Sequence, residues 1–153
     1  MSQARLNPST VAPDAYKAVV GVEHYIQGCG LERSLIELVK MRASQINGCA
    51  YCLDMHSKDA RRNGETEQRL YLLDAWEETA LYTPRERAAL QWTEALTLVA
   101  QTHAPDTAYA AVRAQFSEVE QVNLTTLIGL INLWNRLAIG FRSQIPADKP
   151  KAA

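Results

Sequence analysis

Two capping-box sequences constrain the fold of this chain most strongly, because each marks the start of a helix. Thr83–Glu86 places a threonine at the N-cap, a proline at the first helical position and a glutamate at the third. Ser117–Glu120 repeats the pattern with serine and glutamate. We therefore expect one helix that runs on to about Gln101 and a longer one that ends near Arg142.

Apolar residues recur at helical spacing through most of the remaining sequence, and no segment shows the alternation of period two that a strand needs. The sequence therefore predicts an all-α fold, a single-domain bundle of about seven helices over residues 13–142, with flexible tails at 1–12 and 143–153. Five other helices are expected. The first begins at Pro13 and stops at Gly28–Gly30, the second runs from about Glu32 to Asn47, and the third runs from Ala50 or Tyr51 to Asn63–Gly64. The fourth begins near Thr66 and the fifth at Pro105–Asp106.

The charge and length of the chain exclude several classes of protein. Its 16 basic and 17 acidic residues nearly balance, which gives no electrostatic case for binding nucleic acid or an anionic membrane. With 153 residues the chain can bury a core of its own, and three cysteines are too few for a secreted disulfide framework. No apolar run follows the basic residue near the start, so we expect no secretory signal and a cytoplasmic protein.

The most apolar segment, Leu124–Phe141, is long enough to raise the question of a membrane span. It carries Asn132, Asn135 and Arg136 near its middle, and each of these is costly in lipid. We interpret it as a buried helix of a soluble protein that contacts no membrane. Because the segment is apolar on nearly all sides, we also expect it to be covered in a homo-oligomer.

The residues with the most chemical potential gather around one C-x-x-C motif, Cys49–Cys52. In the expected helices Cys49 lies in a turn and Cys52 in the first turn of the next helix, where unpaired N–H groups and the helix dipole lower the pKa of a thiol. His56 follows Cys52 by four residues and shares its helical face. Glu37 lies on the preceding helix and, in an antiparallel hairpin, can accept a proton or orient His56.

Other uses of a C-x-x-C motif fit these residues less well. A c-type haem site needs a histidine directly after the second cysteine, where this chain has Leu53. A thioredoxin-like site needs a strand before the motif, and here a helix is expected. Zinc would need an unusual ligand set, Glu37, Cys49, Cys52 and His56. A dithiol site is therefore favoured, with a metal-binding site and an inert, buried cysteine pair left as alternatives.

Several other residues have a simpler structural interpretation. Taken alone, Glu37 could form one surface charge pair with Lys40. Trp134 is expected to fill the core or a subunit interface rather than to contact a ligand. Asn135 is expected to tie the last helix to its neighbours.

The four residues of the candidate site resemble the core motif of the alkylhydroperoxidase D-like group, within the carboxymuconolactone decarboxylase-like superfamily. The matched residues, in order, are Glu37, Cys49, Cys52 and His56. The resemblance runs from about Leu31 to Glu65 and continues more loosely through Thr83–Arg87 and Asn132–Arg136. It implies an all-helical fold in which a helix hairpin carries the C-x-x-C motif, assembled as trimers or hexamers.

For function, the resemblance implies a thiol peroxidase or disulfide reductase that acts on organic hydroperoxides. Cys52 would be the peroxidatic thiolate that becomes a sulfenic acid, and Cys49 the resolving thiol that forms a disulfide with it. Glu37 and His56 would form the proton relay that deprotonates Cys52. A dithiol, in some members a lipoylated protein, would then reduce the disulfide, and no cofactor would be bound.

The chain departs from the group at Tyr51, where some members have a histidine between the two cysteines. If that histidine assists the relay, peroxidase turnover would be weaker here or the substrate different. A non-peroxidatic dithiol reductase or redox sensor therefore stays as an alternative function. The decarboxylase branch of the superfamily lacks the C-x-x-C motif, so its lactone chemistry is not implied.

Overall fold

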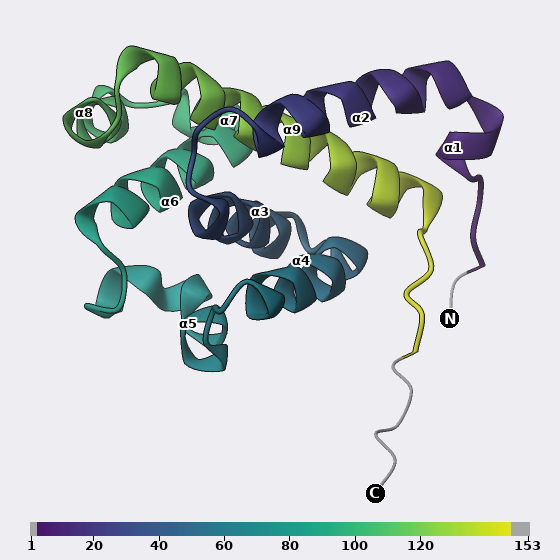
Figure 1. Cartoon of the computed structure of the whole chain (residues 1–153), viewed down its shortest axis with the longest axis horizontal. Coiled ribbons are helices and arrows are strands. Elements are labelled where there is room, and N and C mark those ends of the chain that lie inside the picture. Colours follow the sequence, from purple (N-terminus) through teal and green to yellow (C-terminus); the bar gives the residue numbers. More distant parts are fainter. Residues whose placement is uncertain (1–2, 148–153) are drawn as a thin grey trace, which may run out of the picture.

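The computed structural model of the protein describes residues 3–147, and every regular element in that range is a helix. Nine α-helices and one 3₁₀ helix follow one another along these residues (Figure 1). Their bounds are α1 Pro8–Val11, α2 Pro13–Gln27, α3 Arg33–Asn47, α4 Ala50–Arg62, α5 Glu67–Tyr71, η1 Leu73–Glu78, α6 Pro84–Thr97, α7 Val99–Thr102, α8 Asp106–Gln115 and α9 Glu118–Phe141. The predicted all-α fold is therefore confirmed.

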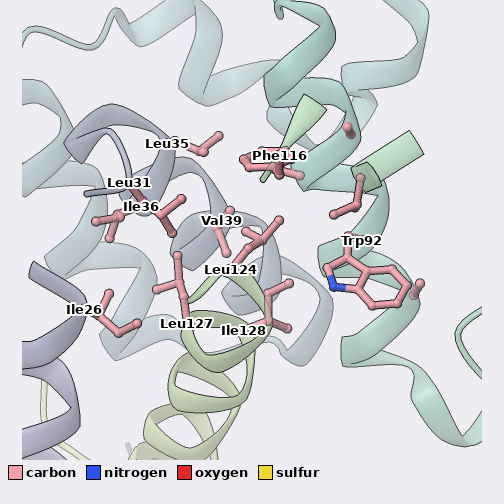
Figure 2. Close-up of a cluster of buried hydrophobic side chains, with 14 of the residues drawn as sticks. Ile26, Leu31, Leu35, Ile36, Val39, Trp92, Phe116, Leu124, Leu127 and Ile128 are labelled. Carbon is pink, nitrogen blue, oxygen red and sulfur yellow. The ribbon is translucent and has the colours of Figure 1, made fainter. Parts of the chain in front are cut away.

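Helix α3 is central to the bundle, because it packs against α4, α6 and α9. Figure 1 shows α2 running alongside α9, with α3 and α4 on the other side of α9. The larger hydrophobic core includes residues of α3, α6, α8 and α9, and Figure 2 shows Val39 and Leu127 within it. A second cluster, which contains Leu38 and Leu73, joins α3 and α6 to α4, α5 and η1. Helix α3 is thus buried on two sides by apolar contacts.

Within residues 3–147, α9 is the one helix long and apolar enough to cross a membrane by length and composition. It packs against α2, α3, α6 and α8. It also buries the amides of Asn123, Asn132 and Asn135, which hydrogen-bond to Cys29, Thr97 and Ser44 respectively. A helix whose buried amides are paired inside the protein fits the core helix that the sequence predicts.

The structure divides two of the segments that the sequence predicts as single helices, and a side-chain hydrogen bond accompanies each division. The helix predicted to reach Gln101 is split into α6 and α7, where the Thr102 hydroxyl donates to the Ala95 carbonyl oxygen at 2.6 Å. Between α4 and α6, the Tyr82 hydroxyl donates to the Arg69 carbonyl oxygen where α5 gives way to η1. A continuing α-helix would offer each carbonyl to a backbone N–H instead.

The N-terminal segment contacts the end of α9. Arg5 donates its backbone N–H to the Phe141 carbonyl and its guanidinium to the Gly140 carbonyl, each at 3.0 Å. Asn7 caps the short helix α1, which the sequence does not predict. Figure 1 shows this purple segment and the yellow segment after α9 at the same end of the molecule. The mobility of the two tails stays a prediction, and residues 1–2 and 148–153 lie outside the described range.

The capping box at the start of α9 is present in the structure and gives a stability prediction. Ser117 Oγ accepts the Glu120 N–H, and the Glu120 carboxylate accepts the Ser117 N–H. Replacing Ser117 by alanine is expected to lower the free energy of unfolding by about 1 kcal/mol, because one N–H loses its acceptor. Urea unfolding measures the change. The control Ser117→Gly is expected to lose only about 0.3 kcal/mol, and equal losses would contradict the capping role.

Candidate functional site

The candidate site is built on the sharp turn that joins α3 to α4. Gly48 ends α3 with φ 67°, a left-handed conformation that glycine adopts without a steric cost. The next residue, Cys49, is the N-cap of α4, and its sulfur accepts the Cys52 N–H at 3.4 Å. Both cysteine side chains are buried, with 1% of Cys49 and 2% of Cys52 exposed. The positions predicted for the two cysteines, in the turn and in the first helical turn, are confirmed.

The two thiols interact directly, and their pKa values move apart. The Cys52 thiol donates a hydrogen bond to the Cys49 sulfur, which, with the N–H of Cys52 and the side chain of Asn135, lowers the pKa of Cys49 to about 7 despite its burial. The same hydrogen bond, burial and the charge of Cys49 raise the pKa of Cys52. The pair therefore loses its first proton from Cys49 as the pH rises through about 7, while Cys52 keeps its own.

For Cys52 the predicted lowering of the pKa is wrong, and the geometry of the first helical turn explains why. The free N–H groups at the start of α4 favour a negative charge close to them. It is the Cys49 sulfur, at the N-cap, that accepts the Cys52 N–H. Cys52 lies one turn further along and acts as a hydrogen-bond donor to Cys49. The spacing of a C-x-x-C motif does not determine which of its sulfurs the N–H groups face.

Glu37 and His56 form a second buried pair across the α3–α4 hairpin. Glu37 Oε2 lies 3.0 Å from His56 Nδ1, and only 6% of Glu37 and 5% of His56 is exposed. The contact predicted from an antiparallel hairpin is thus present. The alternative pairing of Glu37 with Lys40 is wrong, because the buried Lys40 ammonium contacts the Glu23 carboxylate of α2 instead.

Cys52 and His56 both border a pocket of about 710 Å³. The pocket lies between the N-terminal segment, α2, α4, the end of α9 and the residues after it, and its walls include Val20 and Trp134. Within the described residues, His56 Nε2 has no hydrogen-bond partner, whereas every fully buried side-chain nitrogen or oxygen has one. His56 Nε2 is therefore not fully buried, and the pocket is where it can meet a ligand. Trp134, which was predicted to fill the core or a subunit interface, packs against the larger hydrophobic core and also lies on the pocket wall.

Cys49 borders a second, smaller pocket of about 150 Å³ on the other side of Tyr51. Its lining also includes Ala50 and Ile139, while Tyr51 and Arg142 belong to the linings of both pockets. No hydrogen bond joins the Cys49–Cys52 pair to the Glu37–His56 pair among residues 3–147. The structure thus brings the four candidate residues together as two pairs, and each cysteine borders a different pocket.

Asn135 ties α9 to α3, as the sequence analysis expected, but its effect on the thiols, and that of Ser44, was not predicted. Asn135 is fully buried on α9, accepts the Asn47 side-chain N–H at 2.8 Å and donates to Ser44 Oγ at 3.0 Å. The Asn135 side chain favours the ionised form of both thiols, and Ser44 favours that of Cys52. The signal that could have identified Asn135 is an amide on an otherwise apolar helix, since such a group needs buried partners.

The part of the chain that the structure describes contains no group of three or more histidine, cysteine, aspartate or glutamate side chains placed to hold a metal ion. The possible ligands Glu37 and His56 contact each other, as do Cys49 and Cys52. The arrangement found is therefore a dithiol next to a carboxylate–imidazole pair.

A helical bundle in which a hairpin presents a buried C-x-x-C dithiol next to a glutamate–histidine pair defines an alkylhydroperoxidase D-like protein. The chain belongs to the Carboxymuconolactone decarboxylase family, whose sequence profile matches residues 13–95. The resemblance inferred from the spacing of the motif is thereby confirmed.

Similar proteins cover nearly the whole chain. The uncharacterised protein YdfG of Bacillus subtilis (strain 168) is 45% identical over 139 residues, which is 91% of this chain and 94% of YdfG. A crystal structure is known of a protein of unknown function from Agrobacterium tumefaciens, considered a candidate AhpD antioxidant defence protein. Its sequence is 49% identical to this chain, and the two structures match with a TM-score of 0.93 over 95% of this chain and 100% of that one. The debrominase Bmp8 has the same fold, with a TM-score of 0.77 at 22% identity over 88% of this chain and 73% of Bmp8. The fold therefore does not fix the reaction by itself.

Proposed function

We propose that the protein is a cytoplasmic thiol-dependent peroxidase that reduces organic hydroperoxides through Cys49 and Cys52. The observation that carries this proposal is a hydrogen-bonded dithiol whose Cys52 borders the same pocket as His56, the member of the Glu37–His56 pair that lines this pocket. A peroxidase needs a thiolate, a proton donor for the leaving oxygen and a pocket for its substrate. These residues can supply all three.

The first step transfers one oxygen atom from the hydroperoxide to Cys52. The proton shared by the two thiols moves from Cys52 to Cys49, which makes Cys52 the thiolate without removing a proton from the site. The Cys52 sulfur attacks the distal oxygen of R–O–O–H, so that an S–O bond forms and the O–O bond breaks. The alkoxide takes a proton from His56 and leaves as the alcohol R–OH, while Glu37 orients the imidazole ring.

The second step forms the disulfide and releases water. The Cys49 sulfur attacks the sulfur of the Cys52 sulfenic acid, the S–S bond forms, and the hydroxide that leaves takes the Cys49 proton. An external dithiol, of the lipoyl type carried on a protein, then returns two electrons by thiol–disulfide exchange. The smaller pocket beside Cys49 supports a separate approach for that reductant. Exposed apolar residues on α9, among them Val122 and Leu133, support the expected homo-oligomer.

The stoichiometry of a single turnover tests this proposal. Reduced protein mixed with cumene hydroperoxide is expected to form one equivalent of cumyl alcohol per chain and to lose two thiols, because one O–O bond is reduced per disulfide formed. Alcohol is measured by chromatography and thiols by titration, and peptide mapping should find the disulfide between Cys49 and Cys52. Thiol loss at the rate seen without hydroperoxide would contradict the proposed activity.

A second candidate function is dithiol–disulfide exchange without a peroxide, and the lowered pKa of Cys49 favours it. A thiol whose pKa is near the ambient pH attacks disulfides best, and the pKa of Cys49 is about 7. In the single-turnover experiment this function would show as fast oxidation by oxidised lipoamide, with no acceleration of thiol loss by cumene hydroperoxide. Both candidates allow exchange with lipoamide, so the response to cumene hydroperoxide is the result that separates them.

A further inference from the structure

The carboxylates that border the larger pocket are each paired with a cation. Glu23 accepts from the Lys40 ammonium and from Gln27, and its second oxygen lies 3.3 Å from Trp134 Nε1. These partners keep the pKa of Glu23 low against the opposing effect of burial. Asp59 lies 2.6 Å from the Arg62 guanidinium. The negative charges of the pocket are thus balanced by nearby positive ones.

Arg142 is the cation that borders this pocket without a carboxylate partner among residues 3–147. The last two backbone carbonyls of α9 do not pair with the Arg142 guanidinium either. The Gly140 carbonyl accepts the Arg5 guanidinium, and the Phe141 carbonyl accepts the Arg5 N–H. The positive charge of Arg142 is therefore available to a ligand in the pocket.

The backbone of Arg142 positions the residue at the end of α9. Its φ is 56°, in the left-handed region, at the position that follows the last residue of α9. Glycine is the usual residue at such a helix end, because a side chain there is strained. This turn ends α9 beside the pocket, and Arg142 is one of the residues that line it.

The pocket walls are apolar and aromatic near the same arginine. Val20 and Trp134 come from α2 and α9, Met55 comes from α4, and Leu137 lies one turn before the end of α9. A ligand that fits both features has an apolar body and a negatively charged group. A carboxylate suits a guanidinium especially well, because the two can form parallel hydrogen bonds.

We propose that Arg142 binds the carboxylate of an amphipathic organic acid whose apolar body fills this pocket, so that the preferred substrates are hydroperoxides of carboxylic acids. The substrate class rests on the proposed function, whereas binding of the acid itself does not. The apolar body lies against Val20 and Trp134 and places the hydroperoxide group near Cys52. Arg142 is then the residue that distinguishes acids from neutral compounds of the same shape.

Calorimetry with unreactive compounds tests binding apart from any turnover. The reduced protein is titrated with 4-isopropylbenzoate and with the isosteric, neutral 4-isopropylbenzamide. The parent is expected to bind the acid about fivefold more tightly, the upper range for an exposed ion pair. Arg142→Gln is expected to bind the two equally, and Arg142→Lys to keep part of the preference. The control Arg113→Gln, which removes an exposed cation from α8, should bind as the parent does.

Turnover of a matched pair of hydroperoxides tests the substrate class. The pair is cumene hydroperoxide with a para-carboxylate and with a para-carboxamide. The ratio of their kcat/KM values is expected to be about 5 in the parent and in Arg113→Gln, and about 1 in Arg142→Gln. Equal binding of the acid and the amide by the parent would overturn the inference. If the parent binds the acid more tightly but consumes no hydroperoxide, the proposed peroxidase function fails and the Arg142 site stands.

Discussion

Replacing Cys52 by serine is expected to lower the rate of hydroperoxide consumption at least about 100-fold, because a serine hydroxyl does not ionise near neutral pH and is a poor nucleophile. Cys52 is the cysteine that borders the larger pocket together with His56. The measurement is the loss of cumene hydroperoxide under single-turnover conditions. Cys49→Ser should still consume one equivalent and stop at the sulfenic acid of Cys52, which dimedone traps.

Cys29 offers a matched control for these substitutions. It is half-buried between α2 and α3 and packs against the larger hydrophobic core, away from both pockets. Cys29→Ser is therefore expected to consume hydroperoxide at nearly the parent rate. The opposite result for the pair, in which Cys49→Ser loses activity and Cys52→Ser keeps it, would show that the sulfur that holds the resting charge is also the one that attacks.

Replacing Asn135 by alanine is expected to raise the pKa of Cys49 toward its usual value, because the Asn135 side chain stabilises the thiolate. At pH 7 the rate of Cys49 alkylation by iodoacetamide should fall about sevenfold or more, since a hydrogen bond to a charged group is worth about 1.5–3 kcal/mol, which is more than one pKa unit. The substitution should also lower the free energy of unfolding by about 1–3 kcal/mol, because Asn47 and Ser44 each lose a buried partner.

A substitution of Asn123 serves as the control that separates the effect of Asn135→Ala on the thiols from its effect on stability. It is also a buried amide on α9, where it accepts from the Tyr25 hydroxyl at 2.8 Å and donates to the Cys29 carbonyl at 3.2 Å. Asn123→Ala is expected to lower stability by a similar amount and to leave the pH profile of alkylation as in the parent. A parent-like profile in Asn135→Ala would show that Asn135 has only a structural role.

Neighbouring residues determine the parts of the fold and site that the sequence predicted correctly. Gly48 gives the left-handed turn that ends α3, and the same turn places Cys49 at the N-cap of α4. Once the turn is known, the antiparallel hairpin follows, and Glu37 faces His56 across it at 3.0 Å. Each of these steps depends on spacing over one or two helices, which a sequence contains directly.

Contacts between distant segments account for what the sequence did not reveal. Asn135 reaches the thiols because α9 packs against α3 and α4, and Arg5 reaches Gly140 across most of the chain. The breaks within the predicted helices accompany single side-chain hydrogen bonds, such as that of Thr102. Which sulfur carries the charge depends on the direction of the N–H groups in one turn. None of these features follows from helical periodicity.

Cys49 is both the N-cap of α4 and one half of the dithiol, and this double role connects helix stability to the reduction potential of the site. The thiolate accepts an N–H that α4 cannot pair internally, and it lies at the positive end of the helix dipole. Forming a disulfide removes that charge and its favourable interaction with the helix. The free energy that the thiolate contributes to α4 therefore favours the reduced form by the same amount and makes the disulfide a stronger oxidant. Substitutions in the first turn of α4 that touch neither sulfur will change both properties together.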